Sequence, residues 1–378
     1  GTMKQRGHNY AFDILRILAC FLVIVNHTNS EVFLGMNPSL TWALSLAYFY
    51  FSKIAVPIFL MISGALLLRR EYSYKELLIH KVGKVAAVLL LFSLYIYLVE
   101  EGNAFNLHDF INRIIEAPII TSYWYFYMLL GAYLILPFLR KIIIVMKQAD
   151  WLYFFIGWAF FSGLLPVLVR YEIIPTVTFW FDVQIMSNFI GYMFAGYAIT
   201  QTDFSLKVQR CGWLLTLLAI PCILILSVYS GLYELNTWGQ MYLMLDNLYY
   251  LPTMILAVLV FFTVYTLAGK CEFKGWSGKM LSNVAATTFG IYVVHMIYNT
   301  HLSVVRYEIL YFNNRLVSVV LYEIFLFAFC ALAAWCLNNL GSFDFRLFLF
   351  SLKSFFRLCC KADDIRYEDL FVYLFKKA

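Results

Sequence analysis

Ten apolar segments, each long enough to cross a lipid bilayer, dominate this sequence. They lie at 11–33, 41–68, 82–99, 120–139, 150–169, 181–201, 211–230, 247–268, 282–302 and 316–340. A helix crosses the hydrocarbon core with roughly 20 apolar residues, and only helices and closed barrels satisfy their backbone polar groups there. Charged residues make up 13% of the chain, whereas soluble domains carry about 25%. The sequence therefore predicts an all-α, polytopic membrane helix bundle with about ten transmembrane helices.

Lysine and arginine are distributed unevenly between the loops that join these segments. The loops on one side hold 22 of the 28, and those on the other side hold four. Because cytoplasmic loops carry the excess of Lys and Arg, we expect both termini to lie in the cytoplasm and the chain to lie in the plasma (inner) membrane. The net charge of +6 then reflects topology, and no nucleic-acid partner is predicted.

The chain is predicted to consist of one membrane domain and a short tail. The membrane domain comprises residues 1–340, and its longest outward connection, 100–119, is expected to hold a short interfacial helix. Residues 341–378 form a cytoplasmic tail, in which 343–358 mix apolar and basic residues like an amphipathic helix on the inner leaflet. The eight cysteines avoid the outward loops and lack zinc-ligand spacing, so neither a disulfide framework nor a metal site is predicted.

The first apolar segment contains an arginine and a histidine, in the pattern Asp13-x-x-Arg16-x(10)-His27. Eleven residues advance a helix by about three turns, so the two side chains share one face and lie about 16 Å apart along the axis. Ionisable residues within a bilayer are costly and usually functional. A cation at the cytoplasmic end and an imidazole deeper in would share one lumen. Alternatively, Arg16 snorkels to the interface and His27 is a packed polar residue.

The second segment is expected to be broken, because it contains Pro57 and the Ser63-Gly64 pair, and it also carries Lys53 roughly mid-span. Proline frees a backbone carbonyl and a Ser-Gly pair loosens packing, and such breaks usually line a cavity. Lys53 could neutralise a phosphate or carboxylate of a ligand, or it could pair with an acid such as Asp182 or Glu323.

Two further groups of residues each allow two interpretations. Lys81 and Lys84, spaced i, i+3 at the start of the third segment, are either a positive-inside anchor or a site for a phosphorylated cytosolic ligand. Trp124 belongs to an aromatic cluster that is either an interfacial belt or a platform for a sugar ring.

Four sequence motifs, and their order along the chain, resemble those of the acyltransferase-3 family of integral-membrane O-acyltransferases. The resemblance extends from about Phe12 to Leu340. The matching segments are Asp13-x-x-Arg16-x(10)-His27, Val56-Pro57-Ile-Phe59-x-x-x-Ser63-Gly64, the set Trp124, Tyr133 and Pro137, and Phe289-Gly290-Ile291-Tyr292-x-x-His295. The chain departs from the family in two places. Ser122-Tyr123 stand where members often have a histidine, and Lys81 and Lys84 replace an arginine-rich segment.

The resemblance implies transfer of an acyl group, with acetyl expected, from cytosolic acyl-CoA (acetyl-CoA) to a hydroxyl of a cell-surface or lipid-linked saccharide. His27 would be the general base, because imidazole titrates near working pH. Asp13 and Arg16 would organise the cytoplasmic half of the tunnel. Lys81 and Lys84 would bind the phosphates of CoA as point charges.

The remaining candidate residues have less specific roles. Tyr292, His295 or Lys53 could stabilise the tetrahedral oxyanion, and His295 could instead orient His27 or simply be packed. Ser63 and Trp124 are candidates for substrate binding. A transporter or exporter of a glycan or small metabolite is the alternative function, since broken spans and buried charges suit transport too. A structural partner in polysaccharide assembly would leave the Arg16–His27 pair unexplained.

Overall fold

The computed structural model describes most of the chain. The described residues are 8–102, 105–175, 186, 188–202, 204–271, 273–302 and 314–339. They form helices, turns and connections without a strand, which confirms the all-α prediction. Within these residues, nine helices are long and apolar enough to cross a membrane.

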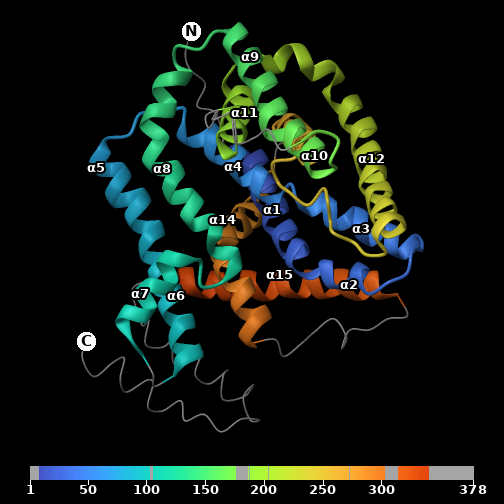
Figure 1. Ribbon diagram of the computed structural model, residues 1–378. Coiled ribbons are helices and arrows are strands. Elements are labelled where there is room, and N and C mark those ends of the chain that lie inside the picture. The colour runs from blue at the N-terminus through green and yellow to red at the C-terminus, as the bar shows by residue number, and fades with distance from the viewer. Residues whose placement is uncertain are drawn as a thin grey trace. The chain divides into compact units, whose positions relative to one another are not determined.

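Figure 1 shows the helices of the described residues. In chain order they are α1 (Tyr10–Thr28), α2 (Ser30–Leu34), α3 (Leu40–Ser52), α4 (Ala55–Leu67), α5 (Tyr74–Glu76), α6 (Gly83–Glu101), α7 (Leu107–Glu116), α8 (Trp124–Ile143), α9 (Gln148–Trp158), α10 (Leu165–Arg170), α11 (Phe189–Gln201), α12 (Phe204–Trp238), α13 (Leu251–Ala268), α14 (Trp276–Ile297) and α15 (Arg315–Asn339). A 3₁₀ turn, Thr121–Tyr123, precedes α8. Three π-helical turns also occur: Leu77–Val82 before α6, Ala159–Leu164 between α9 and α10, and Tyr298–Leu302 after α14.

The nine helices coincide with nine of the ten predicted spans. The tenth prediction, 181–201, includes α11, but residues 181–185 and 187 lie outside the described part of the chain, and so does Asp182. The predicted tail, 341–378, with its amphipathic stretch at 343–358, also lies outside the described residues.

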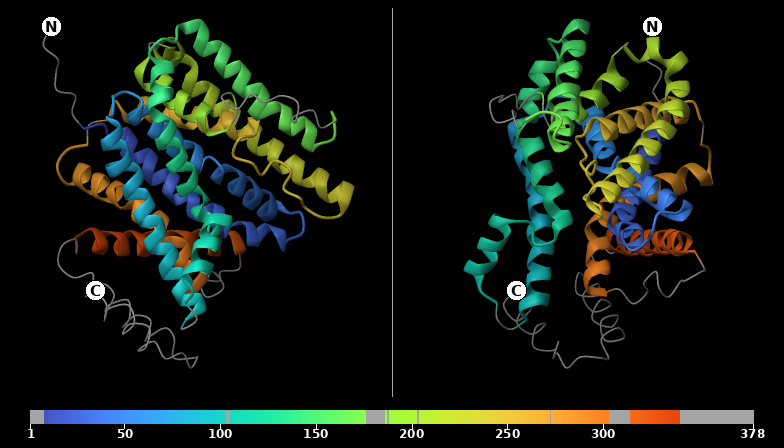
Figure 2. Two further views of the ribbon diagram at one scale, coloured as in Figure 1. Left: turned by 60° about the vertical axis from the view of Figure 1, so that its left-hand side comes forward. Right: turned by 45° about the vertical axis from the view of Figure 1, so that its right-hand side comes forward.

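The described residues form two compact units. The first is drawn from 1–71, 138–288 and 306–331, and the second from 72–137, 289–305 and 332–378. In the first unit, α1 packs against α4 and α13, α4 packs against α11, and α12 packs against α3 and α13. Helix α12 is a single continuous helix of 35 residues (Figure 2), and it extends well beyond the predicted segment 211–230.

Glycines allow α4 and α11 to approach each other closely. A Cβ added to Gly64 would lie 1.9 Å from the carbonyl oxygen of Met193, and one added to Gly196 would lie 1.9 Å from that of Met61. Small residues at such contacts let membrane helices pack backbone to backbone. Gly64 of the Ser63-Gly64 pair therefore serves a close helix contact.

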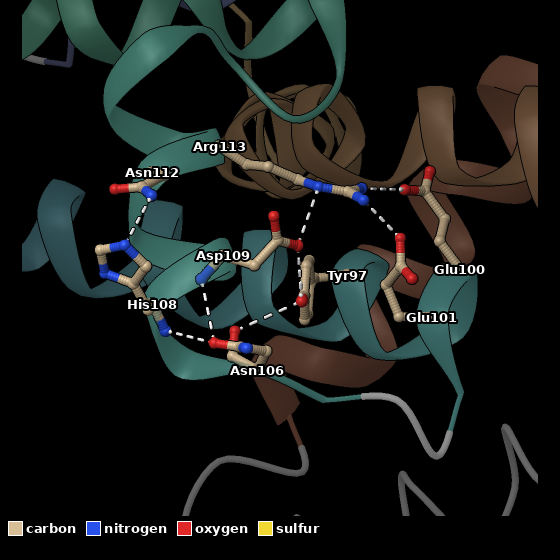
Figure 3. A network of polar contacts seen from close by, with 8 residues as sticks. All are labelled: Tyr97, Glu100, Glu101, Asn106, His108, Asp109, Asn112 and Arg113. Atoms are coloured by element: carbon tan, nitrogen blue, oxygen red, sulfur yellow. Dashed lines mark hydrogen bonds and ion pairs between the residues drawn. The ribbon is translucent and has the colours of Figure 1, made fainter.

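In the second unit, a polar network holds α7 to the end of α6 (Figure 3). The Arg113 guanidinium donates to Glu101 and, at 3.2 Å, to Asp109, and it lies 3.7 Å from Glu100. The Tyr97 hydroxyl donates to Asp109 at 2.8 Å. Hydrogen bonding to Glu101 is the main cause that raises the pKa of Arg113. The short helix expected within 100–119 is thus confirmed. Polar side chains of α7 hold it to the end of α6.

Candidate functional site

The first turns of α1 are organised around a buried carboxylate, that of Asp13. Its side chain accepts a hydrogen bond from Arg16 at 3.3 Å and one from the Ser282 hydroxyl of α14 at 2.9 Å. His8 Nε2 lies 2.5 Å from the same carboxylate. Arg16 keeps 34% of its side chain exposed, whereas Asp13 keeps 4%. Asp13 therefore fixes the direction of Arg16, and the guanidinium stays accessible to a ligand.

His27 lies in the last turn of α1 and is partly buried. The two residues that follow it are anchored to other helices. The Thr28 hydroxyl donates to Glu323 of α15 at 2.7 Å. The Asn29 amide donates to the carbonyl of Ser45 at 2.7 Å, and the Ser45 hydroxyl donates back to Asn29 at 3.0 Å. These bonds fix the backbone at His27, and therefore the position from which its imidazole projects.

Glu323 is a fully buried carboxylate that joins three helices. One oxygen accepts from Thr28 of α1, and the other accepts from the Tyr48 hydroxyl of α3 at 2.8 Å. A buried carboxyl group is tolerated only where hydrogen bonds replace the lost water. Glu323 therefore ties α1, α3 and α15 together through Thr28, the residue that follows His27 in the chain.

Lys53 occupies the break in the second segment. Helix α3 ends at Ser52 and α4 begins at Ala55, so Pro57 lies in the first turn of α4, where a missing N–H costs nothing. The Lys53 ammonium lies 2.6 Å from the carboxylate of Asp246 and 4.0 Å from the centre of the Phe49 ring.

The described residues show an acid partner for Lys53 that the sequence did not suggest. Lys53 pairs with Asp246, in the loop before α13, and not with Glu323, whose two oxygens are bonded to hydroxyls. The other acid considered, Asp182, lies outside the described residues. Lys53 also interacts electrostatically with His27, which places the ion pair in the neighbourhood of the candidate base.

The second unit contains the lysine pair. Lys81 lies in the π-helical turn before α6, with its ammonium 5.8 Å from the ring centre of Tyr72, and Lys84 lies exposed in the first turn of α6. Both are therefore near one end of the third span. Their proposed role toward phosphate stays a prediction.

Tyr292 and His295 are packed within the second unit. The Tyr292 hydroxyl donates to the carbonyl of Ser122, and its ring contacts Tyr125. His295 is fully buried, and its Nδ1 lies 2.7 Å from the carbonyl oxygen of Tyr292. Because a carbonyl can only accept, Nδ1 carries the proton in this contact. Trp124 lies partly buried beside Tyr125.

The predicted site residues thus fall into both units. The first unit contains Asp13, Arg16, His27, Lys53 and Ser63, which is partly buried on α4, and the second contains Lys81, Lys84, Trp124, Tyr292 and His295.

Residues 9–338 match the model of the acyltransferase-3 family, which is described as an acyltransferase domain. The chain belongs to this family. Comparison with curated proteins and with solved structures gave no significant match. The family match covers nearly the whole chain and includes every predicted site residue, so the protein is a membrane acyltransferase at the level that the family defines.

Sequence reasoning missed the contacts of two acids in this acyltransferase. Glu323 stands within an apolar span, and an acid in that position indicates function or a specific partner. The sequence suggests Glu323 only as a partner for Lys53. Asp246 stands at the edge of a predicted segment, and nothing local in the sequence marks it as the partner of Lys53.

Proposed function

We propose that this protein is a membrane O-acyltransferase. It transfers an acyl group, with acetyl expected, from cytosolic acyl-CoA to a hydroxyl of a cell-surface or lipid-linked saccharide. His27 is the general base. The protein lies in the plasma (inner) membrane, and both of its termini lie in the cytoplasm.

The arrangement of α1 is the observation that carries the proposal. An accessible guanidinium, oriented by Asp13, lies near one end of the helix, and His27 lies at the other end, about 16 Å away along the axis. This separation suits a donor whose charged part and reacting thioester are joined by a long arm, as in CoA. Arg16 would contact the pantetheine or phosphate region, and Lys81 and Lys84 would contact phosphates.

The reaction then follows from general acid–base chemistry. His27 accepts the proton of the acceptor hydroxyl as its oxygen attacks the thioester carbonyl. The tetrahedral intermediate collapses, the carbon–sulfur bond breaks, and CoA leaves with the sulfur. The proton held by His27 returns to the leaving thiolate or to water. The anchors at Thr28 and Asn29 support this role, because a general base must stay within hydrogen-bond reach of the attacking hydroxyl.

Mass spectrometry of surface glycans tests the proposal. A strain that lacks the gene is complemented with the wild-type protein, His27→Ala, or the control His108→Ala, in which an exposed histidine of α7 is removed. We expect a glycan that lacks one acyl ester, restored by the wild type and the control but not by His27→Ala. If the whole glycan disappears from the deletion strain, the result favours export over acyl transfer. If His27→Ala restores the ester, His27 is not the base.

A further inference from the structure

The loop between α12 and α13 is held by a buried carboxylate. Glu234 of α12 is 0% exposed, and it accepts hydrogen bonds from three successive backbone N–H groups, at 2.6 Å, 2.8 Å and 2.9 Å. These belong to Tyr242, Leu243 and Met244. Leu243 has a φ of 51°, a backbone conformation that non-glycine residues rarely adopt. Three bonds from successive N–H groups to one side chain hold the loop in one shape.

The same loop reaches the candidate site. Met244 and Leu245 are buried, and the next residue, Asp246, pairs with Lys53. Lys53 in turn interacts electrostatically with His27. The shape of the loop is therefore linked to the surroundings of the proposed base. The positive-inside prediction places this loop on the side of the membrane away from the cytoplasm.

Three aromatic side chains lie exposed where α12 enters the loop. Tyr233, Trp238 and Tyr242 are 42%, 42% and 48% exposed. The ring centres of Tyr233 and Trp238 are 5.7 Å apart, and those of Trp238 and Tyr242 are 5.4 Å apart, each pair nearly perpendicular. We call these three residues the aromatic surface. Its rings support one another at fixed angles, on a backbone that Glu234 holds.

The chemistry of the aromatic surface is uncharged. Asn236, Thr237 and Gln240 are exposed in the same stretch, and the Gln240 amide bonds to the Tyr242 hydroxyl. No Lys or Arg occurs between residues 211 and 269, so the stretch offers no cation for a phosphate or carboxylate. Ring faces bind the apolar C–H face of a sugar, while amide and hydroxyl groups bind its hydroxyls.

An aromatic belt at the bilayer interface would explain part of this pattern. Trp238 stands at the end of a span, where belt residues occur. A belt does not require the positive φ of Leu243, which costs free energy, or a buried carboxyl group to hold it. Sites where a fold accepts such costs are commonly functional.

We infer that the aromatic surface of Tyr233, Trp238 and Tyr242 binds an uncharged sugar ring of the acceptor, on the outer side of the bundle. The inference rests on the proposed function and adds a saccharide subsite to it.

Steady-state kinetics of purified protein in lipid nanodiscs tests the subsite. The acceptor is the unacylated glycan isolated from the deletion strain, and the donor is acetyl-CoA. We expect Trp238→Ala and Tyr242→Ala each to raise the KM for the glycan about tenfold, because each removes a ring face from the contact. The KM for acetyl-CoA should stay within about twofold. Trp213→Ala, which removes a 51% exposed tryptophan from the same helix, should change neither.

The outcomes separate this inference from the proposed function. If the wild type transfers acyl groups and Trp238→Ala leaves the KM for the glycan unchanged, the aromatic surface is a membrane belt and the inference fails alone. If Trp238→Ala raises both KM values equally, its role is structural and the inference also fails. Trp238→Phe, which keeps a ring, should recover most of the affinity. If the wild type transfers nothing to any glycan, the proposed function fails and the inference fails with it.

Discussion

Lys53 and Asp246 form an ion pair, and replacing one partner should destabilise the protein by a different amount from replacing the other. The ammonium and the carboxylate are 2.6 Å apart, but the Lys53 side chain is 11% exposed and that of Asp246 is 32% exposed. The perturbations are Lys53→Met, which keeps the apolar stem, Asp246→Asn, which keeps the shape, and the double variant.

The structure sets the size of the effect. At an effective dielectric constant of about 20, unit charges 2.6 Å apart attract by about 6 kcal/mol, and the desolvation of both groups offsets much of this. We expect a net coupling free energy of about 2 to 3 kcal/mol. Asp246→Asn strands an ammonium that water barely reaches, so it should cost about 3 to 5 kcal/mol. Lys53→Met leaves a carboxylate that is one-third exposed and can hydrate, so it should cost about 1 to 2 kcal/mol.

Equilibrium unfolding in mixed micelles, with SDS as the denaturant and tryptophan fluorescence as the signal, measures these costs. The double-mutant cycle gives the coupling free energy from the wild type, the two single variants and the double variant. The double variant should be more stable than Asp246→Asn, because it no longer strands a charge. The reasoning is wrong if Lys53→Met is the more destabilising single change, or if the two changes add within about 0.5 kcal/mol.

Three further predictions concern packing and hydrogen bonding. Gly196→Ala should destabilise the fold by about 1 to 3 kcal/mol, because the new methyl group would meet the backbone of α4, whereas Gly131→Ala, in open space, should be neutral in the same SDS titration. Equal costs would contradict the close α4–α11 contact. Glu323→Leu should cost about 1 to 3 kcal/mol, because it removes the acceptor of the partly buried Tyr48 hydroxyl and leaves the Thr28 hydroxyl only carbonyls of its own helix, such as that of Ile24. Glu323→Gln should cost under about 1 kcal/mol by the same method. Tyr292→Phe should lower stability by about 1 kcal/mol with little change in kcat; a loss of kcat at full stability would instead show that Tyr292 binds the oxyanion.

The sequence predicts the spans well, because length and apolar character suffice to select a membrane helix. It predicts their ends poorly where tertiary contacts decide them. The predicted segment 211–230 ends before Glu234, an acid that would normally stop an apolar span. Helix α12 continues to Trp238, because the Glu234 carboxylate is satisfied by loop N–H groups that come from later in the chain.

Contacts within one helix could be predicted, and contacts between distant segments could not. Asp13 and Arg16 are three residues apart, so their pairing follows from helical geometry. Thr28 and Glu323 are 295 residues apart, and no local pattern joins them. The sequence also does not predict the π-helical turn Leu77–Val82, which contains Lys81.

Both ends of α1 are anchored, and this limits how the protein can work. Asp13 is tied to α14 near one end, and Thr28 and Asn29 are tied to α15 and α3 at the other. An α-helix is stiff along its axis, so the distance between Arg16 and His27 is fixed by the backbone between them. A motion that brings cation and base together is therefore not available. If His27 is the base, the donor must span the distance with its own arm, and the acceptor must reach His27 from the other side.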